Sequence, residues 1–106
     1  RELRYIRMRE QQSVVLQGIY ENIKSISYLP SQANQVADLL AEIEQGYHKD
    51  NTVEGLLEKL DRLLFAMKEE KLPACREEFE ARAILFYILK QLEKLLMIKR
   101  EFIRAS

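Results

Sequence analysis

Three breaks in an otherwise helical pattern constrain this chain most, because they divide it into four segments. The breaks are two Leu-Pro pairs, Leu29-Pro30 and Leu72-Pro73, and the tripeptide Asp50-Asn51-Thr52. Proline disfavours helical geometry in the residue before it, and Asp and Asn favour turns and helix starts. We therefore expect helices at about residues 2–28, 32–48, 52–70 and 74–104.

Residues at these breaks also explain how the helices begin. Ser31 can accept a backbone N–H and cap the second helix. Asn51 or Asp50 can cap the third helix, with Glu54 in capping-box position after Asn51. Pro73 suits the first turn of the fourth helix, where its missing N–H costs nothing.

The spacing of apolar residues predicts that each segment is an amphipathic helix. The first two stripes are Val15, Leu16, Ile19, Ile23 and Ile26, and Val36, Leu39, Leu40 and Ile43. The third is Val53, Leu56, Leu57, Leu60, Leu63, Leu64 and Met67, and the fourth is Phe79, Ala83, Phe86, Leu89, Leu92, Leu96 and Ile103. Gln12 falls on the first stripe and is expected to be a buried polar residue. Short connections favour antiparallel neighbours, so we predict an all-α, antiparallel up-down-up-down four-helix bundle with longer first and fourth helices.

Composition agrees with one small helical domain over residues 1–106. The 3 Gly and 2 Pro are too few for a turn-rich β fold. Seventeen basic and seventeen acidic residues cancel, so we expect no nucleic-acid partner. The longest apolar run, residues 83–89, is far shorter than the roughly 20 residues of a membrane span. Because the chain begins with Arg1, we expect it to be an excerpt of a longer protein.

The longer outer helices should extend past the inner two at the end where both chain termini lie. This overhang would be a two-helix stalk with apolar residues Leu3, Tyr5, Ile6, Met97, Ile98, Phe102 and Ile103 and basic residues Arg1, Arg4, Arg7, Arg9, Lys99, Arg100 and Arg104. Two helices alone cannot hide so much apolar surface, so we expect an assembly or membrane-proximal surface here. Anionic lipids of the inner leaflet would attract the basic residues. The alternative is a solvated, basic helix face.

The sequence shows no catalytic chemistry and predicts no enzyme and no cofactor. His48 has no second histidine or cysteine with which to share a metal, and its place at a helix end does not suit a phosphotransfer domain. Cys75, the single cysteine, excludes a disulfide within the chain and fits a reducing compartment. It is either a redox-sensitive thiol or an incidental small residue at a helix start.

Charged residues crowd the start of the fourth helix, where Glu78 and Arg82 are spaced to form an i,i+4 ion pair. Arg82 could instead pair with a carboxylate of another helix, or bind the carboxylate of a ligand. Aromatic side chains could line a pocket or belong to the core, namely Tyr20, Tyr28, Phe65, Phe86 and Tyr87.

The pattern Leu-Pro-x-x-Arg-Glu-Glu-Phe-Glu-x-Arg-Ala-x-Leu-Phe in residues 72–86 resembles the C-terminal domain of the putative aromatic acid exporter family of bacterial membrane proteins. Its family-motif residues are Leu72, Pro73, Arg76, Glu77, Glu78, Phe79, Glu80, Arg82 and Ala83. Further resemblance lies in residues 7–12, in Asn51-Thr52 before Leu56-Leu57, and in residues 95–99. The chain departs from the family at Ala81 and Cys75, where Asn and Thr are more usual.

The resemblance implies a parent protein in the cell membrane, with a multi-span N-terminal region followed by this domain on the cytoplasmic side. We expect a non-enzymatic module that assembles or regulates the exporter, as a homo-oligomer or against its own membrane domain. The alternatives are a ligand-sensing bundle that binds an aromatic carboxylate at Arg82, and a stand-alone protein-interaction module.

Overall fold

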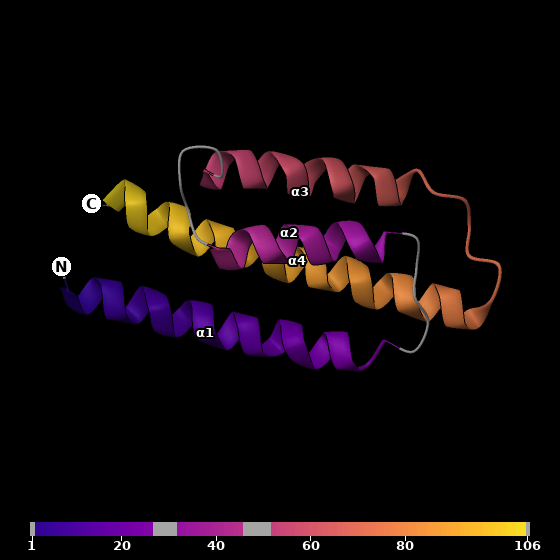
Figure 1. Cartoon of the computed structure of the whole chain (residues 1–106), viewed down its shortest axis with the longest axis horizontal. Coiled ribbons are helices and arrows are strands. Elements are labelled where there is room, and N and C mark those ends of the chain that lie inside the picture. Colours follow the sequence, from indigo (N-terminus) through magenta and orange to yellow (C-terminus); the bar gives the residue numbers. More distant parts are fainter. Residues whose placement is uncertain (1, 27–31, 46–51, 106) are drawn as a thin grey trace.

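A computed structural model describes residues 2–26, 32–45 and 52–105, and it confirms the expected all-α class. The helices are α1 (Glu2–Lys24), α2 (Ala33–Gln45), α3 (Val53–Lys68) and α4 (Arg76–Ala105). Figure 1 shows them running in alternating directions along one axis of the molecule. α1 and α4 have 23 and 30 residues, against 13 and 16 for α2 and α3, so the outer helices are the longer ones, as predicted.

The ends of α1 and α4 lie close together, and both extend past α2 and α3 (Figure 1). We call these ends, residues 2–9 and 97–105, the stalk. The molecule is accordingly elongated, with extents of 50 × 25 × 18 Å. None of the helices in the described ranges has the length and apolar content needed to cross a bilayer.

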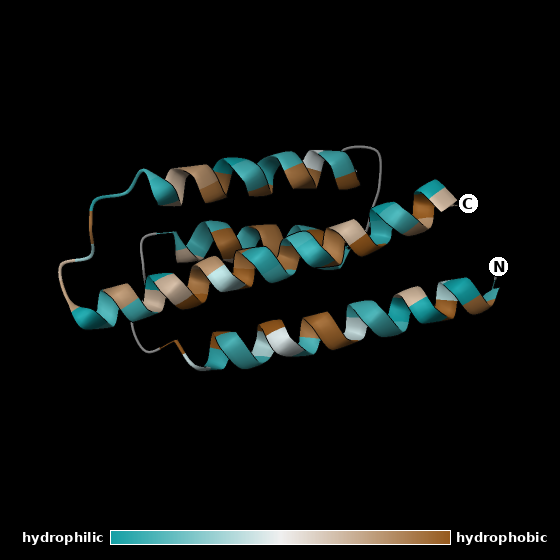
Figure 2. Cartoon of the chain, turned by 180° about the vertical axis from the view of Figure 1, so that it is seen from behind, coloured by the Kyte–Doolittle hydropathy of each residue, from teal (hydrophilic) through white to brown (hydrophobic). Residues whose placement is uncertain are grey.

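α4 is the central helix, because it contacts each of the other three. Its fully buried side chains pack with those of the other helices into one core: Ile19 from α1, Leu56 and Leu60 from α3, and Ile88, Leu89, Leu92, Leu95 and Leu96 from α4. The predicted stripes of α2 and α3 are buried, except that Met67 is half-buried. Figure 2 shows hydrophobic turns facing the interior of the bundle along these helices.

α1 packs mainly along α4 and buries a narrower face than predicted. Met8, Gln12 and Ile19 are buried, which confirms the prediction for Gln12. Of the predicted stripe, Ile23 is instead exposed. A single packing partner covers only one side of a helix, so residues at the edge of the stripe remain in contact with solvent.

Gly18 leaves room for the Gln91 side chain of α4. A Cβ atom at this position would lie 2.8 Å from Nε2 of Gln91. The Gln91 side chain in turn accepts a hydrogen bond from Asn22 Nδ2 at 2.8 Å through its Oε1 atom. The space beside Gly18 thus accommodates the Gln91 side chain, whose hydrogen bond with Asn22 joins α1 to the central helix.

The predicted stripe of α4 is wrong over its first two turns. Phe79 and Ala83 are exposed, and the buried row in this part of the helix is Ala81, Leu85 and Ile88. The rest of the predicted stripe is buried at Leu89, Leu92 and Leu96 and half-buried at Phe86, whereas Ile103 in the stalk is exposed. The register of the whole helix decides which row faces the core.

Two of the predicted helix starts are also corrected. The N-cap of α3 is Thr52, whose side chain accepts a hydrogen bond from Gly55 N at 3.1 Å, so neither Asp50 nor Asn51 has this role. α4 begins at Arg76, which leaves Pro73 in the α3–α4 connection. Ser31, Asp50 and Asn51 lie outside the described residues.

Candidate functional site

The stalk exposes apolar side chains that the rest of the bundle does not cover. Between 42% and 59% of the surface of each is exposed to solvent: Leu3, Tyr5, Ile6, Met97 and Ile103. Ile98 and Phe102 are half-buried. The ribbons of α2 and α3 do not extend along this end of α1 and α4 (Figure 1), although the Glu54 side chain at the start of α3 reaches Arg100 and Arg104.

Phe102 holds the two helices of the stalk together. The centroid of its ring lies 5.9 Å from that of Tyr5, in an edge-to-face arrangement with an interplanar angle of 62°. The Arg4 guanidinium and the Lys99 ammonium lie 5.7 and 5.6 Å from the same ring centroid. Edge-to-face and cation–π contacts each contribute about 0.5 to 1 kcal/mol at such sites. Phe102 is therefore an internal contact of the stalk, with cations on its surface.

The basic residues of the stalk differ in their surroundings. Arg100 and Arg104 reach the start of α3, where their guanidinium nitrogens lie 4.0 and 3.8 Å from the carboxylate of Glu54. Arg4 and Arg7 are exposed on α1. The positive charge that remains at the outer surface therefore lies mostly on α1.

Glu78 and Arg82, the charged pair of the family motif, tie the α3–α4 connection to the start of α4. Nη2 of Arg82 lies 2.6 Å from Oε1 of Glu78, which is the predicted i,i+4 pair. Nη1 of Arg82 donates to the carbonyl oxygen of Lys71, and Oε2 of Glu78 accepts from Ala74 N at 3.0 Å. Both side chains are largely buried, at 20% and 17% exposure. The partners of Arg82 are thus its own helix and the preceding connection, rather than a carboxylate of another helix.

Other motif residues face solvent. Leu72 and Phe79 are strongly exposed, as are Arg76, Glu77, Glu80 and Ala83, while Pro73 is half-buried. Sequence reasoning missed the main-chain partners at Lys71 and Ala74, because side-chain spacing says nothing about where a connection folds back. The pair of Glu and Arg in i,i+4 register was the available signal.

The aromatic residues in the described ranges are mostly exposed, and one of them packs against the core as the sequence suggested. Phe65, Tyr87 and Tyr20 are exposed, and Phe86 is half-buried against the core. Tyr28 lies outside the described residues. Tyr20 lines two clefts, together with residues of α2.

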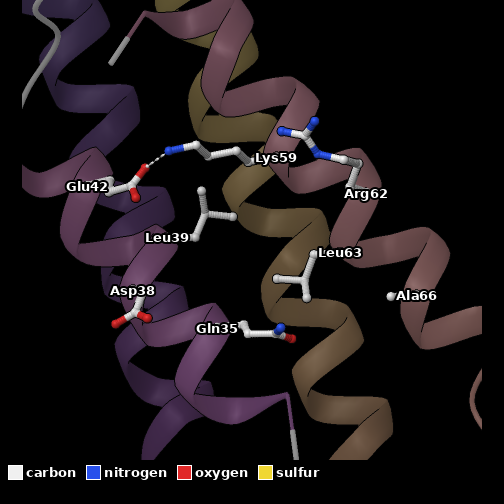
Figure 3. Close-up of a pocket in the computed structure, with 8 residues that line it drawn as sticks. All are labelled: Gln35, Asp38, Leu39, Glu42, Lys59, Arg62, Leu63 and Ala66. Atoms are coloured by element: carbon white, nitrogen blue, oxygen red, sulfur yellow. Dashed lines mark hydrogen bonds and ion pairs between the residues drawn. The ribbon is translucent and has the colours of Figure 1, made fainter. Parts of the chain in front are cut away.

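A groove of about 320 Å³ lies between α2 and α3 (Figure 3). Leu39 and Leu63 form its apolar part, and Lys59 reaches across it to Glu42, with 2.8 Å between Nζ and Oε2. Asp38 and Arg62 add one further charge of each sign. Because its charges balance and its ion pair is exposed, this groove favours no particular class of ligand.

Two further clefts meet at a hydrogen bond between α1 and α2, which the Tyr20 hydroxyl donates to Oε1 of Glu44. On one side lies an apolar groove of about 410 Å³ whose lining includes Ile23, Ala37 and Leu40. On the other lies a smaller, more polar cleft of about 240 Å³. Tyr20 and Glu44 line both and form the partition between them.

Two further features concern metal binding and thiol chemistry in the described ranges. No group of three or more His, Cys, Asp or Glu side chains is placed there to hold a metal ion. Cys75 is an exposed free cysteine just before α4. His48 lies outside the described residues.

Comparison with known protein families shows to which family the chain belongs. Residues 2–100 match the family described as the putative aromatic acid exporter C-terminal domain. The chain belongs to this family. The match confirms the resemblance of residues 72–86, and the family is described as part of an exporter rather than as a class of enzymes.

Two proteins that are similar to this exporter domain are longer than the chain. The chain is 36% identical over 98 residues to the uncharacterized protein YqjA of Bacillus subtilis (strain 168), and the match covers 92% of the chain but 30% of the relative. A crystal structure of a putative membrane protein from Clostridium difficile 630 superposes with a TM-score of 0.85 at 30% identity, over 94% of the chain and 59% of that protein. The chain therefore spans about a third of the curated relative, and the family and the structural neighbour are described as parts of membrane proteins.

Proposed function

We propose that this exporter domain is a non-enzymatic module on the cytoplasmic side of the membrane, which assembles the exporter by joining two copies through the stalk. The observation that carries the proposal is the exposed apolar surface of the stalk, at Leu3, Tyr5, Ile6 and Ile103. Apolar side chains gathered at one end of a small domain are typical of an interaction surface.

The location of the chain ends supports a place beside the membrane region of the parent protein. α1 begins and α4 ends at the stalk (Figure 1). A preceding membrane region would therefore connect at the stalk, and the positive charges of Arg4 and Arg7 would face anionic headgroups there, each contributing up to about 1 kcal/mol close to the surface.

The proposal is tested by cross-linking the full-length parent protein in membranes. Ile6→Glu and Ile103→Glu should each reduce the cross-linked dimer, because they place a carboxylate in the apolar contact. Phe102→Glu would be a poorer choice, since Phe102 contacts Tyr5 within the stalk. Val14→Glu, at an exposed apolar residue in the middle of α1, is the matched control. A dimer that survives both stalk substitutions would refute the proposed contact.

Ligand sensing at Arg82 is the second candidate function, and the surroundings of Arg82 weigh against it. Both terminal nitrogens of its guanidinium already have protein acceptors, at Glu78 and Lys71. An aromatic carboxylate would have to displace them. A titration of the domain with benzoate that Arg82→Ala abolishes, without loss of folded structure, would favour this candidate.

A further inference from the structure

The apolar groove of about 410 Å³ separates α1 from α2, and α4 supplies its floor. Within the described residues, α1 and α2 make no close backbone contact with each other, whereas both pack on α4. Leu85 and Ile88 of α4 line the groove, and both are buried. The walls are mostly apolar side chains of α1 and α2. The groove therefore has the size and the lining of a small-molecule site.

The two walls of the groove differ in the size of their side chains. On α1, Tyr20 and Ile23 are large and are 41% and 40% exposed. On α2, Ala37 and Ala41 line the groove with single methyl groups. Apolar surface of α1 is thus left uncovered along the groove, and a molecule bound between the two walls would bury it.

The hydrogen bond between Tyr20 and Glu44 lies at one end of the groove, because Glu44 follows the other lining residues of α2 along that helix. A carboxylate has about four acceptor positions, and the Tyr20 hydroxyl occupies one of them. Glu44 can therefore also accept bonds from a ligand. Aromatic rings attract cations to their faces, so Tyr20 adds a second feature that suits a positive charge.

The charges around the groove favour a cation over an anion. No Lys, Arg or His belongs to its lining within the described residues, and Glu44 carries the one negative charge there. α2 contains Asp38, Glu42 and Glu44 but no basic residue. Arg9 and Lys99 line the adjoining cleft, on the other side of the partition. Glu44 would therefore repel a carboxylate ligand in the groove and attract an ammonium group.

We propose that this groove binds an organic amine, namely an ammonium group on an apolar body of about two fused rings. The ammonium group lies against the Glu44 carboxylate and Tyr20, and the rings lie between Ile23 and Ala37. An apolar cavity of about 150 Å³ holds benzene, so a groove of about 410 Å³ has room for the larger body. The bound amine bridges α1 and α2, and it requires no contribution from the stalk.

Calorimetric titration of the chain with 1-naphthylmethylamine, which is protonated at neutral pH, tests the proposal. We expect saturable binding. 1-Naphthalenemethanol has the same rings and a neutral hydroxyl, and it should bind about five- to tenfold more weakly, because it lacks the ion pair and the cation–π contact. The anion 1-naphthoate should bind more weakly still. An amine titration that does not saturate, or naphthoate binding as tight as that of the amine, would overturn the proposal.

Two variants separate the charge of the site from its shape. Glu44→Gln keeps an acceptor for the Tyr20 hydroxyl but removes the charge, so it should weaken amine binding about three- to fivefold and leave binding of the alcohol unchanged. Ala37→Leu fills the groove from an exposed position of α2, so it should weaken binding of the amine and of the alcohol alike. Leu and Gln are good helix formers, and the circular dichroism spectrum of each variant verifies its fold.

Asp38→Asn is the matched control, because Asp38 is a carboxylate of α2 that lines the groove between α2 and α3 instead. It should leave amine binding unchanged. An equal loss of amine binding in Asp38→Asn and Glu44→Gln would contradict the role of Glu44. Amine binding that Ala37→Leu leaves intact would show that the amine binds outside the groove.

Discussion

Ile88 and Phe79, both on α4, differ in burial and should therefore differ in how much they contribute to the stability of the fold. Ile88 is fully buried and Phe79 is 61% exposed. Ile88→Ala should therefore lower the free energy of unfolding by about 2 to 5 kcal/mol, through lost burial and a residual cavity. Phe79→Ala should lower it by less than about 1 kcal/mol. Urea denaturation of both variants checks this, and a larger loss for Phe79→Ala would contradict the register of α4.

At the residue scale, the sequence correctly predicted which side chains are buried in helices that have a single row of apolar residues. The stripes of α2 and α3 and the burial of Gln12 are correct. α4 offers two rows in its first two turns, and the large side chain of Phe79 favoured the wrong one, since Ala81 and Leu85 are buried there instead. The continuation along the helix does not separate the two rows, because both lead into the buried residues Leu89, Leu92 and Leu96.

Cys75 lies at the N-cap position of α4, since its carbonyl oxygen accepts a hydrogen bond from Phe79 N at 3.0 Å. Cysteine is a poor capping residue, whereas a serine side chain accepts a backbone N–H readily. Cys75→Ser should raise the free energy of unfolding by about 0.5 to 1 kcal/mol. Thermal unfolding under reducing conditions measures the change, with Cys75→Ala as the control that should bring no gain.

At the element scale, the Glu78 and Arg82 pair holds the α3–α4 connection against the start of α4 through its bonds to the main chain of Ala74 and Lys71, and we call this network the clasp. Glu78→Ala and Arg82→Ala should each lower the free energy of unfolding by about 1 to 2 kcal/mol, because each removes a charge-assisted bond and a main-chain contact. The double variant should lose clearly less than the sum, since the two side chains share one network.

Lys59→Ala is a suitable comparison for this cycle. The Lys59 and Glu42 pair is more exposed, so its loss should change stability by less than about 1 kcal/mol. Fully additive losses at Glu78 and Arg82 would show that the clasp does not exist as a unit.

The helices themselves were predictable to within a few residues because prolines, polar breaks and stripes are local signals. Connections were not predictable in the same way. α1 ends at Lys24, four residues before the expected end, since Ser25 N bonds back to Asn22 O and Ile26 N to Ile23 O. The role of Glu78 depends on the path of residues 71–74, which no pattern in the sequence specifies.

At the scale of the whole molecule, the stalk follows from helix lengths alone, and so does its exposed apolar surface. Helix lengths do not predict which side chains of the stalk contact one another. Phe102 contacts Tyr5, and Arg100 reaches Glu54, so part of the predicted outer surface is used within the chain. The surface that remains for a partner is therefore centred on Leu3, Ile6 and Ile103.

Light scattering over a wide range of protein concentrations tests the central claim most directly. We expect the mass to rise from 12.6 kDa toward twice that value in the wild type and in Val14→Glu, and to stay at the lower value in a variant with both Ile6→Glu and Ile103→Glu. A wild-type mass of 12.6 kDa at every concentration, or a dimer that persists in the double stalk variant, would contradict assembly through the stalk.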